Sequence, residues 1–234
     1  MSPGSIARIS FLNVSGFLLF ADHGALLIDT GYGNTTSFFI NALKKYNLQP
    51  EDIRLIVLTH THFDHAGGVA EIAAITGAPV AVHQLEANYL ERGSTPVPPG
   101  TRWKAKVLHV IARLFARKKF RYTGVIPNIR FEKEFSLKEY GVKGKVLHTP
   151  GHTEGSVSVI LENGEAIVGD NVMGIPRKNY FPPFAVDIRG VINTWQTYVD
   201  LGLETVFPAH GRSVKVKDLA ANMDIVKNIY KIHL

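Results

Sequence analysis

Apolar residues along this chain recur in two patterns, which separate the strands we expect from the helices. Short continuous apolar runs rich in Val, Ile, Leu and Phe predict strands. These runs lie at Phe17–Phe20, Ala25–Ile28, Ile53–Leu58, Pro79–Val82, Val146–Leu147, Ser156–Leu161, Ala166–Val168 and Thr205–Phe207. Apolar positions three or four residues apart predict helices at Thr35–Tyr46, Val69–Thr76, Trp103–Phe120, Arg189–Leu201 and Val216–Lys231.

Two stretches of the chain share one pattern, which is strand, tight turn, strand and then Asp. They are Gly16–Asp29 and Gly155–Asp170, and Asn163-Gly164 in the second is a strong hairpin signal. Each is followed by a helix, a buried strand and a histidine, His60 in the first half and His210 in the second. A chance likeness of two hairpins is the alternative. The repeat predicts one α+β domain over all 234 residues, with two ββα-like halves whose His and Asp side chains gather at one edge.

The composition is that of a globular protein, with 45% hydrophobic and 20% charged residues. No apolar run approaches the roughly 18 residues of a membrane-spanning helix. Residues Met1–Phe20 are interrupted by Asn13 and Ser15, which favours a first strand over a signal peptide. Cysteine is absent, which excludes disulfides, thiol nucleophiles and Cys-ligated metals, and we expect a cytoplasmic protein.

The net charge of +6 comes from one local segment. Residues 101–121 hold eight basic residues and no acid: Arg102, Lys104, Lys106, Arg113, Arg117, Lys118, Lys119 and Arg121. The remainder has 18 basic and 20 acidic residues, a net charge of −2. The positive charge is therefore no general nucleic-acid signal, and this segment needs its own explanation.

The segment that follows the expected strand Ile53–Leu58 carries the clearest chemistry. It places three imidazoles and one carboxylate within six residues: His60, His62, Asp64 and His65. His60 and His62 are two apart in an extended segment, so both side chains point to the same side. Such a donor set suits a borderline divalent cation such as Zn²⁺, and the alternative is a His-rich surface turn.

Three further candidates lie far away in the sequence, each at the end of an expected strand. They are His152 in a Pro-Gly turn, Asp170 after the second hairpin and His210 after the last strand. A single His or Asp at a strand end is more often a cap or turn residue. Together with the cluster, however, the three offer a second set of metal ligands from both halves of the chain.

In their order and separations, these motifs resemble those of the metallo-β-lactamase superfamily, in its glyoxalase II and lactonase-like hydrolase branch. The resemblance extends from Asp29 to His210, nearly the whole chain. It implies an αββα sandwich with a dinuclear metal site at its edge. By position, His60, His62 and His152 would hold one metal, Asp64, His65 and His210 the second, and Asp170 would bridge them. Asp29 would support the site from behind, although a turn residue is an equal interpretation.

The resemblance implies two divalent metal ions, with Zn²⁺ favoured and Fe or Mn as alternatives. Two metals about 3.5–4 Å apart can share a hydroxide near neutral pH, because metal binding lowers the pKa of water to about 7. That hydroxide would attack an ester, thioester or lactone carbonyl. Asp64 and Asp170 are the residues to which we assign catalytic importance.

Departures from the patterns of particular enzyme classes in this superfamily reduce the number of activities that we expect. The lactamase classes with a Cys ligand are excluded, and the 24 residues after His210 leave little room for the helical glutathione-binding region of glyoxalase II. N-acyl homoserine lactonases typically place Tyr three residues after the bridging Asp, where this chain has Met173. Tyr180 is the nearest substitute, although a packed loop residue is the alternative.

An insertion at about residues 86–130 is the remaining clue to the substrate. Its apolar positions Trp103, Val107, Val110, Ile111, Leu114 and Phe115 recur at helical spacing, with basic residues between them. We expect a helical lid that is apolar inside and basic outside, and that favours a small-molecule substrate with an apolar or acyl part. A packed surface helix and a membrane-surface element are alternatives. We expect no nucleic-acid partner and no transmembrane segment, and a homodimer stays open.

Other functions are compatible with the same ligands. A mononuclear iron dioxygenase of the persulfide type would need fewer metal contacts, and a phosphodiesterase or nuclease would use the same pair of metals. A non-catalytic scaffold would not need seven ligands. Metal content and substrate preference distinguish these functions.

Overall fold

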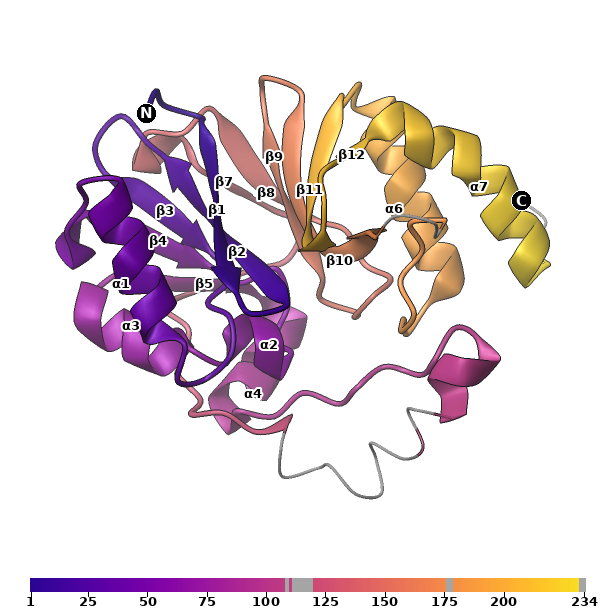
Figure 1. The fold of residues 1–234 in the computed structure, drawn as a ribbon, viewed down its shortest axis with the longest axis horizontal. Helices are drawn as coiled ribbons and strands as arrows, with labels where there is room; N and C mark the ends of the chain where they lie inside the picture. Colours follow the sequence, from indigo (N-terminus) through magenta and orange to yellow (C-terminus); the bar gives the residue numbers. More distant parts are fainter. Residues whose placement is uncertain (108–109, 111–119, 176–178, 232–234) are drawn as a thin grey trace.

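The computed structural model describes residues 1–107, 110, 120–175 and 179–231 of the chain. Two six-stranded sheets face each other, with helices on their outer sides (Figure 1). The first sheet consists, in spatial order, of β1 (Ile6–Phe11), β2 (Val14–Phe20), β3 (Ala25–Ile28), β4 (Ile53–Val57), β5 (Val80–His83) and β6 (Ile129–Phe131). The second consists of β12 (Val214–Lys215), β11 (Thr205–Gly211), β10 (Glu165–Gly174), β9 (Val157–Leu161), β8 (Gly144–His148) and β7 (Glu134–Ser136).

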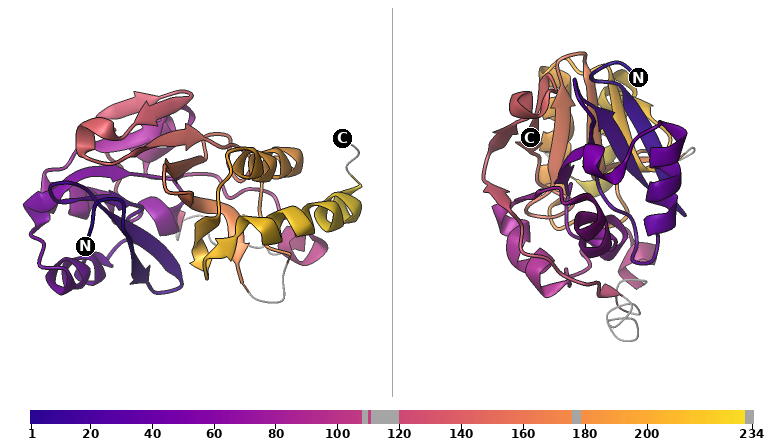
Figure 2. Two further views of the ribbon diagram at one scale, coloured as in Figure 1. Left: turned by 90° about the horizontal axis from the view of Figure 1, so that it is seen from above. Right: turned by 90° about the vertical axis from the view of Figure 1, so that its left-hand side faces the viewer.

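Helices cover both outer faces and the edge between the sheets (Figures 1 and 2). They are α1 (Thr36–Lys45), α2 (Phe63–Ala66), α3 (Val69–Thr76), α4 (Gln84–Arg92), α6 (Ile188–Asp200) and α7 (Val216–Tyr230), with short 3₁₀ turns at Pro50–Asp52 and Lys138–Tyr140. In Figure 1, α1 and α3 lie outside the first sheet, and α6 and α7 outside the second. The expected αββα sandwich is confirmed.

Three separate apolar clusters match these four layers. One, containing Leu27 and Phe39, packs the first sheet against α1 and α3. A second, containing Val168 and Trp195, packs the other sheet against α6 and α7. The third fills the space between the sheets and includes Phe17 from one and Val159 from the other. Strands β2 and β3 are buried along their whole length, which explains their continuous apolar sequence.

The predicted internal repeat is present in the strand pairing. In the first half β2 pairs antiparallel with β3, and β3 pairs parallel with β4. In the second half β9 pairs antiparallel with β10, and β10 pairs parallel with β11. Because β3, β4, β10 and β11 thus occupy equivalent places, the residues at their carboxyl ends converge on one edge of the sandwich.

Several elements differ from the sequence expectation, and the short strands β6, β7 and β12 were not among those expected. Residues Met1–Phe20 form a hairpin of two strands, β1 and β2, which turns at Leu12 and Asn13. The insertion begins with α4, which the apolar pattern did not predict, and residues 103–107 and 110 are helical. Most of the expected helix Trp103–Phe120 falls on 108–109 and 111–119, outside the described residues.

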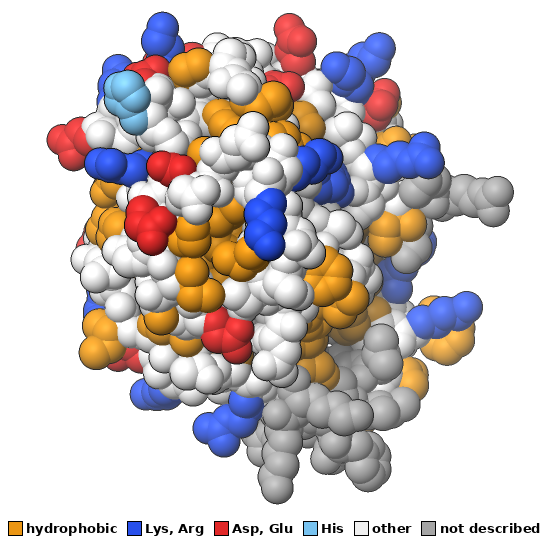
Figure 3. All heavy atoms as spheres, turned by 60° about the vertical axis from the view of Figure 1, so that its left-hand side comes forward, with side chains coloured by type: hydrophobic (Ala, Val, Ile, Leu, Met, Phe, Trp, Pro, Cys, Tyr) orange, Lys and Arg blue, Asp and Glu red, His pale blue; other side chains and the backbone are white. Residues whose placement is uncertain are grey.

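Acidic and basic side chains are interspersed over the face shown in Figure 3, in keeping with the nearly neutral body of the chain. None of the helices in the described ranges has the length and apolar character needed to cross a membrane.

Candidate metal centre

The loop between β4 and α2 presents alternate side chains to two different surroundings. His60 and His62 point to a common centre, where their rings lie 4.6 Å apart between centroids. Thr59 points the other way, and both its N–H and its hydroxyl donate to Asp29 at 2.7 Å. The period of two in an extended segment produces this separation, as the sequence predicted.

His60, His62 and His152 form the first candidate metal-binding group. One nitrogen from each ring lies within 4.8 Å of the others. His62 Nε2 donates to the carbonyl of Pro96 at 3.2 Å, and His152 Nδ1 donates to that of Phe184 at 2.9 Å. A carbonyl only accepts, so the remaining nitrogens, His62 Nδ1 and His152 Nε2, carry lone pairs, and they face each other at 3.1 Å.

The second candidate group contains Asp64, His65 and His210, joined by Asp170. His210 Nε2 lies 3.5 Å from Asp64 Oδ2 and 3.6 Å from Asp170 Oδ1, and His65 Nε2 lies 3.4 Å from that same Oδ1. The other oxygen of Asp170 lies 3.7 Å from His152 Nε2. Asp170 therefore faces both groups, one oxygen toward each.

Hydrogen bonds from behind fix the rings of this second group. His65 Nδ1 donates to Asp29 Oδ2 at 2.8 Å, and His210 Nδ1 donates to the carbonyl of Asn13 at 2.9 Å. In both residues this leaves Nε2 to face the centre. Asp29 itself is buried and adopts a left-handed backbone with φ of +60°. Its supporting role, which the sequence left undecided, agrees with these contacts.

The two groups differ in protonation. Burial lowers the pKa of His60 and His62, and it lowers the pKa of His152 to about 4, so these rings are neutral at neutral pH. For His65, burial acts in the same direction but is outweighed by Asp170 and Asp29, which raise its pKa well above the ordinary value. The pKa of His210 is raised as well. Burial lowers it, but the effect of Asp170 and Asp64 is larger.

The carboxylates of the second group stay ionised. Burial alone would raise the pKa of Asp170, but His210 and His65 hold it well below its ordinary range. The pKa of Asp64 is lowered as well, because His65 and His210 outweigh the effect of burial.

The residues fit divalent cations. Three buried atoms at the centre have no hydrogen-bond partner among the described residues: His60 Nε2, His65 Nε2 and Asp170 Oδ1. Such buried polar atoms are unfavourable unless something else satisfies them. The facing lone pairs of the first group also repel unless a positive charge lies near them, and burial opposes supplying that charge by protonation. Nitrogen and oxygen donors without sulfur suit zinc, manganese or iron.

The structure thus brings all seven predicted ligands to one edge of the sandwich. Sequence reasoning missed the residues that hold them from behind, among them Thr59, Glu86 and Asn171. Asn171 donates to the carbonyl of Thr149 at 2.7 Å and accepts from the N–H of His152 at 3.2 Å. Its signal was a polar residue directly after Asp170, inside an otherwise apolar strand.

The insertion contacts the centre through its extended part. Pro99 and Thr101 form backbone hydrogen bonds with Ala185 and Pro183, beside the carbonyl of Phe184 that accepts from His152. The apolar side chains expected to face inward do not do so in the described part. Trp103 is 71% exposed, and Val107 and Val110 are exposed as well.

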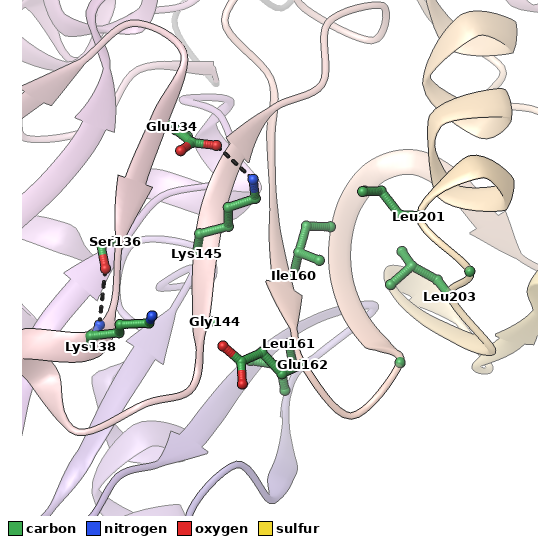
Figure 4. Close-up of a pocket in the computed structure, with 12 residues that line it drawn as sticks. Glu134, Ser136, Lys138, Gly144, Lys145, Ile160, Leu161, Glu162, Leu201 and Leu203 are labelled. Atoms are coloured by element: carbon green, nitrogen blue, oxygen red, sulfur yellow. Dashed lines mark hydrogen bonds and ion pairs between the residues drawn. The ribbon is translucent and has the colours of Figure 1, made fainter.

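A separate hollow lies at the ends of strands β7, β8 and β9 that are remote from the metal centre. Figure 4 shows the residues that line it. It has a volume of about 510 Å³ and is lined by residues of β7, β8 and β9 and by Leu201 and Leu203 after α6. Lys145 and Glu134 form an ion pair of 2.6 Å across its wall. None of the seven candidate ligands lines this hollow, so it is distinct from the metal centre.

Comparison with known proteins agrees with this geometry. The probable metallo-hydrolase MJ0888 of Methanocaldococcus jannaschii is 29% identical over 189 residues, covering 80% of this chain and 82% of that protein. An N-acyl homoserine lactonase from a Bacillus species is 24% identical and covers 69% of this chain. The atrochrysone carboxyl ACP thioesterase of Passalora fulva is also 24% identical and covers 92%. The matches span 62% of the lactonase and 52% of the thioesterase.

Solved structures show the same fold. The metallo-beta-lactamase family protein TTHA1429 of Thermus thermophilus superposes with a TM-score of 0.71 at 19% identity, covering 98% of this chain and 80% of that one. The class B3 di-zinc metallo-beta-lactamase LRA-12, from an Alaskan soil metagenome, has a TM-score of 0.68 at 18% identity, covering 99% and 92%. The family model of the metallo-beta-lactamase superfamily matches residues 9–210. With its His and Asp cluster at the sheet edge, the chain belongs to the metallo-beta-lactamase superfamily and is a metallo-hydrolase.

Proposed function

We propose that this metallo-hydrolase binds two divalent cations, with zinc as the favoured metal, and hydrolyses an ester, thioester or lactone. His60, His62 and His152 would hold one cation, Asp64, His65 and His210 the other, and Asp170 would contact both. The observation that carries this proposal is the convergence of seven His and Asp side chains into two groups with Asp170 between them. Three of their buried atoms have no hydrogen-bond partner among the described residues.

The bound cations would supply a hydroxide nucleophile near neutral pH and polarise the carbonyl of the substrate. The chain's own residues keep the histidines of the first group in the protonation state that metal binding requires. Pro96 and Phe184 hold the N–H of His62 and His152 away from the centre. Asp170 stays ionised between the two groups. We assign proton acceptance to Asp64 because its side chain is more exposed than that of Asp170, at 16% against 8%.

Aromatic side chains beside the ligands support a substrate with an apolar or acyl part. Phe63 lies between His62 and Asp64 in the sequence and is half-buried. Its ring centroid is 5.6 Å from that of Tyr32 and 4.8 Å from that of Phe120, at the end of the insertion. The lactonase and the thioesterase, by their names, act on compounds with an acyl group. We therefore favour an acyl substrate over a phosphodiester.

Metal analysis together with a substrate panel tests the proposal. We expect about two zinc or manganese equivalents per chain, and faster turnover of lactones, thioesters or carboxylic esters than of bis(p-nitrophenyl) phosphate. His62→Ala is expected to lower kcat/KM by about 10²-fold or more and to lower metal content. His23→Ala, at an exposed histidine in the β2–β3 turn, is the matched control and is expected to change neither.

Three results would contradict the proposal. One iron per chain with oxygen uptake on a persulfide would indicate a dioxygenase. Preferred hydrolysis of the phosphodiester would indicate a nuclease or phosphodiesterase. Full activity and metal content in His62→Ala would refute the ligand assignment.

A further inference from the structure

Thr61, between the two candidate ligands His60 and His62, has every polar group engaged. Its N–H donates to Glu86 Oε2 at 3.0 Å, and its hydroxyl donates to the same oxygen. Its carbonyl accepts from Thr95 Oγ1 at 2.6 Å and from the hydroxyl of Tyr122 at 2.9 Å. Thr61 is fully buried, so these contacts fix both peptide planes that flank it.

Glu86 is the acceptor for two of these hydrogen bonds. It lies on α4, its side chain is almost completely buried, and it takes part in none of the ion pairs among the described residues. A buried carboxylate without a counter-ion is unfavourable, and hydrogen bonds have to compensate for its lost hydration. Thr61 supplies two of them. An apolar residue of the same volume would leave the buried N–H and hydroxyl of Thr61 without this acceptor, so the carboxyl group of Glu86 is matched to Thr61.

A glycine from the second half of the chain leaves space for the side chain of Glu86. Gly155, three residues after His152, packs directly against it, and a β-carbon at Gly155 would lie 2.6 Å from Glu86 Cγ. A larger residue there would push the carboxylate away from Thr61. Glu86 therefore lies between the loop that carries His60 and His62 and the turn that carries His152.

The remaining contacts of Thr61 come from two other segments of the insertion, residues 93–96 and 121–122, which are joined to each other. The N–H of Tyr122 donates to the carbonyl of Gly93 at 3.0 Å, and Ser94 pairs with Arg121. From this junction Thr95 and Tyr122 reach the carbonyl of Thr61. The next residue, Pro96, accepts from His62. The insertion is thus bonded to the histidine loop at two consecutive residues, Thr61 and His62.

We propose that Glu86, assisted by Thr95 and Tyr122, is a positioning residue for the metal centre. By holding Thr61, it fixes the orientation of the neighbouring imidazoles of His60 and His62. This inference rests on the proposed ligand assignment. Without the carboxylate, the Thr61 peptide can rotate, and both imidazoles lose their common centre. Supporting groups of this kind change metal affinity by about 10–100-fold.

Metal affinity and ligand geometry test the role without depending on turnover. Full-length protein is loaded with zinc, and the rate of zinc transfer to a chromophoric chelator is measured. Cobalt-loaded protein is then examined by visible absorption, which reports the ligand arrangement. We expect Glu86→Ala to release zinc about 10–100-fold faster and to alter the cobalt spectrum. Glu86→Gln keeps an oxygen acceptor for Thr61 and is expected to stay within about threefold of wild type.

Glu71→Ala is the matched control, because Glu71 also accepts a hydrogen bond from a threonine hydroxyl, that of Thr36, but at the exposed surface. It is expected to leave zinc release and the cobalt spectrum unchanged. Should Glu86→Ala not fold, Thr61→Val removes only the hydroxyl and is expected to release zinc faster than wild type.

Wild-type release rates in Glu86→Ala or, if that variant does not fold, in Thr61→Val would overturn the positioning role and leave the proposed function intact. Equal acceleration in Glu71→Ala would overturn it too, by showing a general loss of stability. Wild-type protein that takes up no metal would overturn both proposals.

Discussion

The ligands from the first half of the chain (His60, His62, Asp64 and His65) and those from the second half (His152, Asp170 and His210) are held by different chemistry. In the first half, buried carboxylates support the loop of His60 and His65: Asp29 binds Thr59 and His65, and Glu86 binds Thr61. In the second half, neutral groups do the same work. Asn171 binds both sides of the His152 turn, and a chain of hydroxyls underlies it, from Thr149 through Ser158 to Tyr198.

The difference bears on the unequal protonation of His65 and His152. Asp170 raises the pKa of both rings. At His65 it is joined by Asp29, and together they outweigh burial, whereas at His152 no carboxylate lies behind the ring and burial lowers its pKa to about 4. A charged support sets the proton positions of its ligand as well as its orientation. A neutral support sets orientation alone. The support of His65 by Asp29 is therefore expected to depend on charge, and the support of His152 by Asn171 on hydrogen-bond geometry.

The largest expected effect is that of Asp29→Asn, which removes the charge and keeps the shape. Asn also adopts the left-handed backbone of this position readily. Its amide would donate toward His65 Nδ1, which would move the ring proton to Nε2 and turn that nitrogen away from metal binding. We expect kcat/KM to fall by about 10²-fold or more and one metal equivalent to be lost, measured by steady-state kinetics and metal analysis.

Asp22→Asn is the control for Asp29→Asn. Asp22 is an exposed aspartate in the β2–β3 turn, and the change is expected to alter neither quantity. Retention of both metals and full activity in Asp29→Asn would show that the support of His65 does not depend on the charge of Asp29.

An intermediate effect is expected for Asn171→Ala in the second half. The change leaves the N–H of His152 and the carbonyl of Thr149 without partners in a buried place. Each such group costs about 1–3 kcal/mol, so we expect a loss of a few kcal/mol in the free energy of unfolding. Activity is expected to fall by about tenfold or less. Urea denaturation measures the free energy of unfolding, and steady-state kinetics measures the activity. A larger loss of activity in Asn171→Ala than in Asp29→Asn would contradict the expectation that the charged support matters more for activity than the neutral one.

The sequence predicted the ligands better than their supports. His60, His62, Asp64 and His65 adjoin one another, and His152, Asp170 and His210 follow apolar strands, so local pattern was enough to find them. The repeat was visible for the same reason, since each hairpin is local in sequence. The first strand was merged with the second, although the alternate burial of Ile6–Phe11 matches a strand with one exposed face.

Glu86 shows why the supports were missed. Helix α4 is largely polar in sequence, so no apolar pattern revealed it, and a glutamate on such a helix is normally exposed. Its burial depends on Gly155 and on a threonine 25 residues earlier, which only the packed fold brings together. In the described part of the expected lid, Trp103, Val107 and Val110 are exposed, because helical spacing defines an apolar face without stating what that face contacts.

The smallest expected effect concerns His83, which connects the two halves. Its ring stacks on His148 at 4.0 Å between centroids, at the ends of β5 and β8. Its Nδ1 accepts from the N–H of Leu85, at the start of the helix that carries Glu86, while its Nε2 donates to the carbonyl of Glu132. Both bonds need the neutral ring, and burial lowers the pKa of His83.

Below the ordinary histidine pKa of about 6.5, the unfolded chain therefore takes up a proton at His83 that the folded chain resists. The contribution of His83 to stability is complete above that pH and is lost as the pH falls below it, toward the lowered folded value. His83→Asn keeps an acceptor for the N–H of Leu85 and does not titrate. Unfolding free energies of metal-free wild type and His83→Asn, measured from pH 7.5 to 5, are expected to converge as the pH falls. Parallel curves would show that His83 titrates alike in both states and that the two halves are joined there by packing alone.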